Sequence, residues 1–461
     1  MKVDIKNFGP IRKFSYDLDK DLVITYGNNN IGKSYAMQIV YLLLKTFLQA
    51  DVTHRYYFKG YFISYNSSVS INDLEVAVEK FMDSDECVRD ITELITGEVY
   101  KLIKEMFFPE FLNSCGNTFG NFDKTLENNP IITVSNEKYT FEFDLNARNI
   151  TGKNNMKAIR LRRTESDFHK SRNYADHLDI YVVSDVSHPV ERMKDEILQR
   201  YIDAIYSVAG RFADVHFLPA SRSGIYSGMN AFGSIVAELS RNRAFFTKKI
   251  EFPGISEPIS DYFISLSNIT RVKANDYLSD FYTRIEKEIL KGSVTLDRTK
   301  NALIYRPHNV EANFEMTEVS SMVSEISPIV AFLKYVIAVR GNRRDKRKSI
   351  LFIEEPEAHL HPYNQIALIE VFAELIQSDI KLIMSSHSNY IFNKLNNLVL
   401  SKKLDYKRYQ PIILEEGNGD GSISKSIEID ELGAVDENFA DVSERLYCER
   451  QEIIRSLNEE E

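Results

Sequence analysis

Alternating apolar and polar positions open the chain. Residues 3–5 and 14–16 alternate on either side of Gly9 and Pro10, which predicts two short strands joined by a turn. The apolar run at 22–24 predicts a third, buried strand. Residues 36–48 are apolar on almost every face, as in a helix packed between a sheet and its neighbours. The first fifty residues therefore predict a strand, a loop and a helix.

The pattern changes between residues 51 and 212. Helical periodicity over 74–103 gives way to alternating strands, which are clearest at 131–134, 139–145 and 180–183. A helix over 193–208 leads back to a core strand at 215–218. We interpret 51–212 as an inserted domain of mixed structure.

The rest of the chain returns to a strand–loop–helix order. We expect a Ser/Gly-rich loop over 219–228, a hairpin and an apolar helix over 326–339. The other expected elements are helices at 234–246, 277–290 and 389–400, and strands at 294–296, 303–305, near 314, at 350–353 and at 380–384. The tail holds a Gly-rich turn and a charged helix. The predicted domains are 1–50, 51–212, 213–400 and 401–461.

Composition narrows the class of protein. The 461 residues are 43% hydrophobic and 27% charged, which suits a soluble globular protein. No apolar stretch approaches the ~18–20 residues that a membrane-spanning helix needs, and the N-terminus lacks a secretory pattern. Three widely spaced cysteines indicate neither a disulfide framework nor a zinc knuckle. A cytoplasmic location is expected, and the net charge of −10 argues against a protein that coats nucleic acid.

A glycine-rich loop carries the clearest chemistry. Its eight residues follow the spacing G-x-x-x-x-G-K-S and are Gly27, Asn28, Asn29, Asn30, Ile31, Gly32, Lys33 and Ser34. The glycines let the backbone wrap around phosphate, Lys33 reaches the β- and γ-phosphates, and Ser34 binds Mg²⁺. Because an apolar strand precedes the loop and a helix begins at it, the helix dipole also points at the phosphates. The loop predicts ATP binding.

Two adjacent carboxylates follow the apolar strand at 350–353. In P-loop ATPases the first such residue, here Glu354, holds Mg²⁺, and the second, Glu355, polarises the attacking water. Neighbouring carboxylates repel one another unless a cation lies between them. We therefore expect a Mg²⁺ site at Ser34 and Glu354, with Glu355 as the general base.

Three histidines lie near these carboxylates. His387 follows the next predicted strand, so it lies on the same edge of the sheet, and we expect it at the γ-phosphate. His359 and His361 are spaced i, i+2, which does not place them on one helix face. Zinc sites also usually take Cys or a third converging ligand. We expect no metal site beyond Mg²⁺.

These motifs resemble a known family. The run Ile-Glu-Glu-Pro-Glu-Ala-His-Leu-His-Pro at 353–362, with the loop at 27–34 and His387, resembles the ABC-type ATPases of the RecF, SMC and OLD (overcoming lysogenization defect) group. The resemblance covers the first fifty residues and roughly 213–400. It implies a D-loop at 357–360 that crosses to a partner subunit, and a switch role for His387.

The resemblance also implies a signature motif at 319–325. Ser320 and Ser321 would contact the γ-phosphate held by the other subunit, so catalysis would need a dimer. Met322 and Val323 replace both signature glycines, and Glu354 stands where most members have Asp. Neither the long heptad arms of SMC proteins nor an acidic nuclease module after Leu400 is recognisable. The chain looks like a stand-alone ATPase subunit, as found beside a separate effector in anti-phage systems such as Septu and PARIS.

Two basic clusters could contact the phosphates of DNA, although solvated loops are the alternative. The first consists of Arg340, Arg343, Arg344, Lys346, Arg347 and Lys348. The second consists of Lys153, Lys157, Arg160, Arg162, Arg163, Lys170 and Arg172. A further arginine, Arg222, follows a core strand in an element that resembles one common in the group. It faces the nucleotide, relays its state or belongs to a structural turn, and the sequence leaves these options open.

The sequence therefore predicts an α/β P-loop NTPase, with an ABC-type ATPase head and a mixed α/β insertion. We expect it to hydrolyse ATP with Mg²⁺ as a dimer or higher homo-oligomer, and to control a DNA transaction or a separate effector such as a nuclease in antiviral defence. The alternative is an ATP-switched scaffold that holds and releases a nuclease or toxin with little turnover. A transporter subunit is disfavoured by the large insertion and missing glycines. A kinase is disfavoured because it has no use for Glu354–Pro356 and His387.

Overall fold

The computed structural model describes most of the chain. The described residues are 1–58, 71–154, 157–164, 171–182, 187–228, 254–269, 273–297, 302–337, 347–417, 421–434 and 447–451. The helix expected at 234–246 and most of the first basic cluster lie outside these ranges. None of the described helices combines the length and the apolarity that crossing a bilayer requires.

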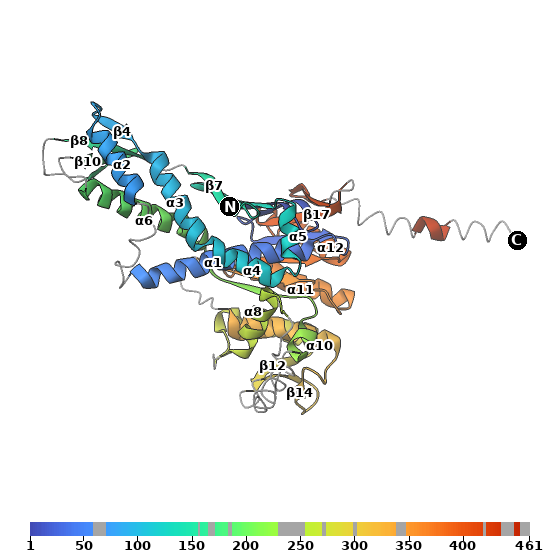
Figure 1. The fold of residues 1–461 in the computed structure, drawn as a ribbon. Helices are drawn as coiled ribbons and strands as arrows, with labels where there is room; N and C mark the ends of the chain where they lie inside the picture. The colour runs from blue at the N-terminus through green and yellow to red at the C-terminus, as the bar shows by residue number, and fades with distance from the viewer. Residues whose placement is uncertain are drawn as a thin grey trace, which may run out of the picture.

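An eleven-stranded sheet forms the centre of the molecule (Figure 1). Its first five strands are mutually parallel and follow the order β11(Phe212–Leu218), β15(Lys348–Glu354), β16(Ile380–Ser386), β3(Leu22–Gly27), β17(Tyr409–Glu416). The three middle strands are almost entirely buried and are mainly apolar, which is typical of parallel strands covered on both faces.

The other half of the sheet is mostly antiparallel. Its order continues with β18(Ser422–Ser426), β2(Ile11–Asp17), β1(Lys2–Phe8), β5(Ile131–Ser135), β6(Tyr139–Asp144), β7(Asn149–Asn154). The strands expected at 3–5, 14–16, 131–134 and 139–145 are all present. Strand β5 pairs directly with β1, so part of the segment 51–212 extends the sheet that the first residues begin. The division into four domains stays a prediction.

Helices cover both faces of the parallel half. Helix α1(Lys33–Phe58) lies on one face, and α11(Pro362–Leu375) and α12(Asn389–Leu400) lie on the other. Alternate residues of β15 point to opposite faces, since Ile350 and Phe352 pack in the core with α1 while Leu351 and Ile353 pack in the core with α11 and α12. The helix expected at 389–400 is confirmed residue for residue.

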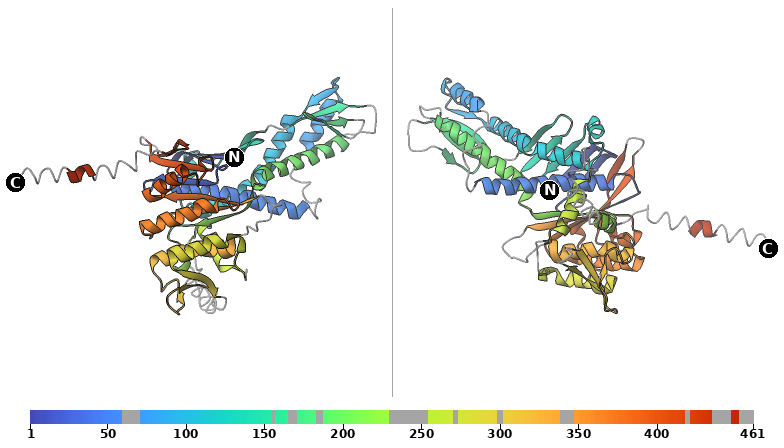
Figure 2. Two further views of the ribbon diagram at one scale, coloured as in Figure 1. Left: turned by 180° about the vertical axis from the view of Figure 1, so that it is seen from behind. Right: turned by 60° about the horizontal axis from the view of Figure 1, so that its bottom comes forward.

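A long arm projects from one side of the sheet (Figures 1 and 2). It is built from α2(Ile71–Met82), α3(Thr92–Met106), α6(Ser187–Ala209) and a four-stranded sheet at its tip, in the order β4(Val88–Asp90), β8(Ala158–Arg163), β10(His177–Val182), β9(Ser171–Asn173). The short helix α4(Phe108–Thr118) packs against α1 and α3, and α5(Phe122–Glu127) packs against β1.

A second lobe lies on the other side of the sheet from the arm (Figure 1). It contains α8(Glu257–Ser267), α9(Ser279–Arg284), the π-helical η4(Ile285–Leu290), the hairpin β12(Gly292–Asp297) and β13(Ala302–Pro307), β14(Phe314–Glu315), α10(Ser321–Ala331) and the π-helical η5(Phe332–Val336). The predicted hairpin and third strand are confirmed.

The loop expected at 219–228 is wrong from residue 222 onward, because residues 222–228 are helical. The carboxylate of Glu325 accepts hydrogen bonds from the backbone N–H groups of Arg222 and Ser223. These are donors that the first turn of a helix leaves unpaired. A residue about one hundred positions away therefore stabilises this helix start, which local composition did not indicate.

Candidate active site

The predicted site residues meet at the carboxyl ends of three neighbouring parallel strands. Strand β3 ends at Gly27, β15 at Glu354 and β16 at Ser386. Glu354 pairs in register with Ser385, and Ser385 with Thr25. The glycine-rich loop, both carboxylates and His387 therefore follow adjacent strands at one edge, which is where open α/β sheets bind ligands.

The backbone of the loop requires its glycines. Gly27 and Gly32 have φ angles of 140° and 103°, which L side chains rarely adopt. A Cβ atom on Gly27 would lie 2.4 Å from the carbonyl oxygen of Leu414. Helix α1 begins at Lys33, so its unpaired N–H groups face the loop as the motif predicts.

Lys33 is buried at the centre of this edge. Its Nζ donates to the carbonyl oxygens of Gly27 (2.8 Å) and Asn28 (2.6 Å). Burial lowers the pKa of Lys33 to about 8, although the charges of Glu355 and Glu357 act in the opposite direction. The amine thus lies among carboxylates and loop carbonyls, where a phosphate group would bring it a stronger partner.

Glu354 has the features of a cation ligand. Its Oε2 accepts from the backbone N–H of Ala220 (3.2 Å), and the hydroxyl of Ser34 bonds to the same carboxylate. Its Oε1 is buried and has no hydrogen-bond partner within the described ranges. Burial raises the pKa of Glu354. A buried, unpartnered carboxylate oxygen beside a hydroxyl provides the hard oxygen donors that Mg²⁺ prefers, so these residues fit the ion.

Glu355 and His387 form a pair at the mouth of the site. His387 Nε2 lies 3.5 Å from Glu355 Oε1, and both side chains are partly exposed. The hydrogen bond from His387 lowers the pKa of Glu355, so this carboxylate is ionised at neutral pH. The φ angle of Glu355 is 43°, a left-handed conformation that is uncommon outside glycine.

Glu357 has a position that its motif did not predict. Its side chain turns inward, and its Oε1 accepts from the Ser386 hydroxyl (2.8 Å) and from the backbone N–H of His387 (2.6 Å). Burial raises its pKa, and its Oε2 has no partner in the described structure. Glu357 therefore holds the turn that carries His387. An acidic residue two positions after the predicted base was visible in the sequence, but its inward direction was not.

Ser320 and Ser321 lie at the start of α10, and both are exposed. In the described part of the chain, their hydroxyls bond neither to the loop nor to the carboxylates. The structure therefore does not bring them to Lys33 of the same subunit. Their exposed helix N-terminus can receive an anionic group from another molecule.

Arg222 does not face the nucleotide loop. Its side chain is completely buried, and its guanidinium donates to the carbonyl oxygens of Glu354 (2.8 Å) and Glu355 (3.3 Å). The option of direct nucleotide contact is therefore wrong. Arg222 lies behind the two carboxylate residues and contacts their main chain.

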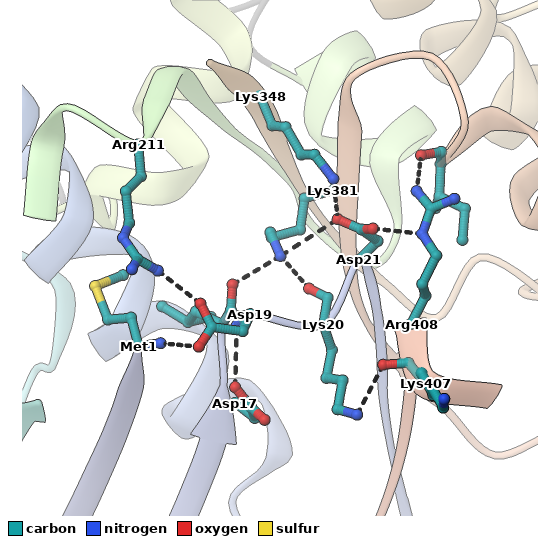
Figure 3. A network of polar contacts seen from close by, with 12 residues as sticks. Met1, Asp17, Asp19, Lys20, Asp21, Arg211, Lys348, Lys381, Lys407 and Arg408 are labelled. Atoms are coloured by element: carbon teal, nitrogen blue, oxygen red, sulfur yellow. Dashed lines mark hydrogen bonds and ion pairs between the residues drawn. The ribbon is translucent and has the colours of Figure 1, made fainter. Parts of the chain in front are cut away.

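Several of the basic residues considered for DNA contact have partners in the protein. Lys348 bonds to Asp21 at the opposite end of the strands (Figure 3). In the second cluster, Arg162 Nε bonds to Asp179 (2.7 Å), and Arg163 donates to the carbonyl oxygens of Phe81 and Met82. Positions 340, 343, 344, 346 and 170 lie outside the described residues.

The fold and the loop define the class of protein. A glycine-rich loop between a buried strand and a helix, at the carboxyl edge of a parallel sheet, is typical of P-loop NTPases. The sequence matches the model of a family described as "AAA ATPase domain" over residues 1–211 and 230–392, which is more than half of the chain. The chain belongs to this AAA ATPase domain family. The predicted fold class is thereby confirmed.

Solved structures of SMC head domains are among those to which the chain is similar. An SMC head bound to the C-winged helix domain of ScpA gives 11% identity and a TM-score of 0.37, covering 93% of this chain and 98% of that one. The SMC head from Thermotoga maritima gives 10% and 0.35 with the same coverage. An SMC head with an extended coiled coil, bound to the C-terminal domain of ScpA derived from Pyrococcus furiosus, gives 11% and 0.36, covering 97% and 98%. Curated protein sequences give no match.

Proposed function

We propose that this protein hydrolyses ATP, and that two subunits complete each other's sites. The observation that carries the proposal is the pairing of Ser34 with Glu354, whose buried Oε1 has no hydrogen-bond partner among the described residues, beside the buried Lys33. Burying such a carboxylate costs free energy unless a cation binds it. Membership of an ATPase family supports the same function.

Each residue then has a defined task. Lys33 and the N-terminus of α1 hold the phosphates, while Ser34 and Glu354 hold Mg²⁺, which neutralises phosphate charge when bound. Glu355 accepts the proton of the attacking water, because its lowered pKa keeps it ionised at neutral pH. His387 orients Glu355 and faces the γ-phosphate, and Glu357 holds the backbone of His387 in place.

The partner subunit contributes the signature residues. Ser320 and Ser321 are exposed at a helix N-terminus and bond to no part of their own site in the described structure. A two-fold axis would bring these residues of one subunit onto the phosphate held by Lys33 of the other. In the cell, we propose that ATP-driven closure controls a DNA transaction or a separate effector such as a nuclease in anti-phage defence. The resemblance to stand-alone ATPase subunits supports this role.

Mixing two inactive variants tests the shared site. Glu355→Gln removes the base, and Ser321→Arg blocks the contact with the partner's phosphate. In a mixed dimer, one site carries both defects while the other has an intact Glu355 and an intact Ser321. Random mixing should therefore restore at most about a quarter of the wild-type phosphate release, since half of the dimers are mixed and each has one working site.

Ser401→Arg is the matched control, because it places the same side chain on an exposed position after α12. It should hydrolyse ATP like the wild type. The shared site would be contradicted if the wild-type protein released phosphate as a monomer, at a rate per subunit that does not change on dilution. A wild type that binds ATP with almost no turnover would instead favour the ATP-switched scaffold.

A further inference from the structure

A buried arginine links two parts of the protein that the proposed mechanism uses separately. Arg222 Nη1 donates to the carbonyl oxygens of Glu354 (2.8 Å) and Pro219 (3.1 Å), and Nη2 donates to that of Glu355 (3.3 Å). Both proposed catalytic-site carboxylates are therefore held through their main chain by one planar group. A guanidinium presents its N–H donors in a rigid fork, so it fixes the two carbonyls relative to each other.

The other side of Arg222 contacts the helix that carries the signature serines. Its Nε donates to the carbonyl oxygen of Glu325 (3.0 Å), and its backbone N–H donates to Glu325 Oε2 (3.0 Å). Oε1 of the same carboxylate accepts from the N–H (3.2 Å) and the hydroxyl (2.6 Å) of Ser223. Glu325 lies one turn after Ser321 on α10. Arg222 thus connects the first turns of α10 directly to the backbone carbonyl groups of Glu354 and Glu355.

Arg222 also helps to hold the strained backbone of Glu355. The left-handed φ of 43° at Glu355 is unfavourable for a residue with a side chain and persists only where neighbouring groups hold it. Arg222 binds its carbonyl, and Ser385 accepts its N–H through a carbonyl oxygen (3.1 Å). A movement of Arg222 would therefore change the direction of the Glu355 carboxylate.

We propose that Arg222 is a positioning residue that couples α10 to Glu354 and Glu355, and so makes the two ATP sites of a dimer cooperative. This inference rests on the proposed function. In each subunit, α10 contacts the phosphate of the partner's site, while Arg222 holds the carboxylates of its own site. Closure at one site therefore orients the base at the other, and linkage makes the coupling reciprocal.

Arg222→Lys separates coupling from nucleotide binding. A lysine keeps the charge, but its single ammonium cannot span both carbonyls and Glu325. We expect about a tenfold to hundredfold lower kcat, because misplacing a catalytic group by ~1 Å has effects of this size. ATP affinity measured by calorimetry should be retained, and the sigmoidal dependence of rate on ATP should become hyperbolic.

Two further variants keep this test interpretable. Glu325→Gln interrupts the same link from the other side, and the double variant should lose no more activity than the stronger single variant. Ser223→Ala is the matched control, because it removes a hydrogen bond to the same carboxylate and leaves every contact of Arg222. It should keep its kcat and its sigmoidal rate curve. Circular dichroism and thermal unfolding confirm that each variant is folded.

Amide hydrogen exchange tests the link without turnover. In a Ser321→Arg background, which prevents closure, any effect of nucleotide on α10 must travel within one subunit. Adding the non-hydrolysable analogue AMP-PNP with Mg²⁺ should slow exchange at 27–36 and change exchange at 321–327. With Arg222→Lys added, the first change should remain and the second should disappear.

The outcomes distinguish the two levels of the proposal. If AMP-PNP slows exchange at 27–36 in every variant, and changes exchange at 321–327 equally with arginine or lysine at position 222, the coupling is overturned. The proposed ATP site would then stand. A folded Arg222→Lys variant with wild-type kcat would overturn it as well. An absence of any response at 27–36 in the wild type would instead show that the proposed nucleotide site is wrong.

Discussion

The parallel strands of the large sheet carry a charged cluster at each end, and the two clusters differ in how completely their groups are paired. At the amino ends, Asp21 accepts from Arg408 (2.6 Å), bonds to Lys348 and lies 3.6 Å from Lys381 (Figure 3). Although burial by itself would raise the pKa of Asp21, these cations hold it below its usual value. At the carboxyl ends, Glu354 is buried and Glu357 is half-buried, the environment raises both pKa values, and each carboxylate keeps one buried oxygen without a hydrogen-bond partner in the described structure.

A lowered lysine pKa does not tell the two ends apart. Burial lowers the pKa of Lys33 and of Lys381 to about 8 in both places. The unpartnered acceptors do distinguish them. A cluster that is fully paired holds strands together, whereas one with buried, unpaired acceptors sacrifices stability and keeps the capacity to bind a cation.

The largest expected effect is on catalysis. Glu355→Gln keeps the shape of the side chain but removes the base, so kcat should fall by about 10²–10⁴. Nucleotide affinity should remain, because Lys33 and the loop are unchanged. Phosphate release and calorimetry measure the two quantities. The control Glu374→Gln alters an exposed carboxylate of α11 that pairs with Arg284, and its kcat should match that of the wild type.

The second expected effect concerns stability: neutralising a carboxylate should change the free energy of unfolding in opposite directions at the two ends of the strands. Asp21→Asn removes the buried negative charge that Lys348, Lys381 and Arg408 surround, and should lower the free energy of unfolding by about 3–5 kcal/mol. Glu354→Gln removes a buried, under-paired charge and should raise it by about 1–3 kcal/mol when Mg²⁺ and nucleotide are absent. Urea unfolding at pH 7.5 measures both. Equal losses in the two variants would contradict the distinction between the ends.

The same two variants should respond to pH in opposite ways. The pKa of Asp21 is lowered in the folded state, so its stabilising contribution is present at neutral pH and is lost as pH falls through the folded pKa. The pKa of Glu354 is raised, so its contribution is present at low pH and is lost as pH rises through the folded pKa. Toward low pH, the free energy of unfolding of both variants should therefore approach that of the wild type. Asp21→Asn should approach it from a lower value, and Glu354→Gln from a higher value.

The smallest expected effect compares the two lysines. Lys33→Ala removes a charged hydrogen-bond donor to phosphate, so ATP affinity should fall about tenfold to hundredfold. Lys381→Ala removes a buried partner of Asp21 and of the carbonyl oxygen of Leu18 (2.7 Å). It should lower the free energy of unfolding but leave the ATP affinity of the folded protein unchanged. Calorimetry measures the ATP affinity of both variants, and urea unfolding measures their stability. Equal changes in ATP affinity in the two variants would contradict the comparison.

Local patterns explain how much of the fold was predictable. The strands at 3–5, 14–16 and 22–24 and the helix at 389–400 follow from periodicity and from their turn residues, which act within a few positions. The hairpin strands at 294–296 and 303–305 were predictable for the same reason. Partner choice was not, because alternation at 131–134 predicts a strand but does not say that it pairs with β1.

The site shows the same division. The loop residues, both carboxylates and His387 could be proposed from the sequence because phosphate and Mg²⁺ chemistry require particular residue types at close spacing. The structure brings them to one edge of the sheet, and their roles stay a prediction. The buried contacts of Arg222 and the inward turn of Glu357 were not identified. Their partners, Glu325 for the first and Ser386 for the second, are distant in the sequence, and no short motif records such a contact.

The sequence by itself determined that this chain forms an α/β nucleotide-binding protein, since the glycine spacing and the periodic apolar runs are local consequences of backbone sterics and of burial. Only the tertiary structure decided which charges are satisfied. Whether a buried carboxylate is paired with cations, like Asp21, or keeps an unpartnered oxygen, like Glu354, depends on which groups from distant segments reach it. The physical reason is that the free energy of a buried charge is set by its three-dimensional surroundings, which the parallel sheet assembles from separate strands.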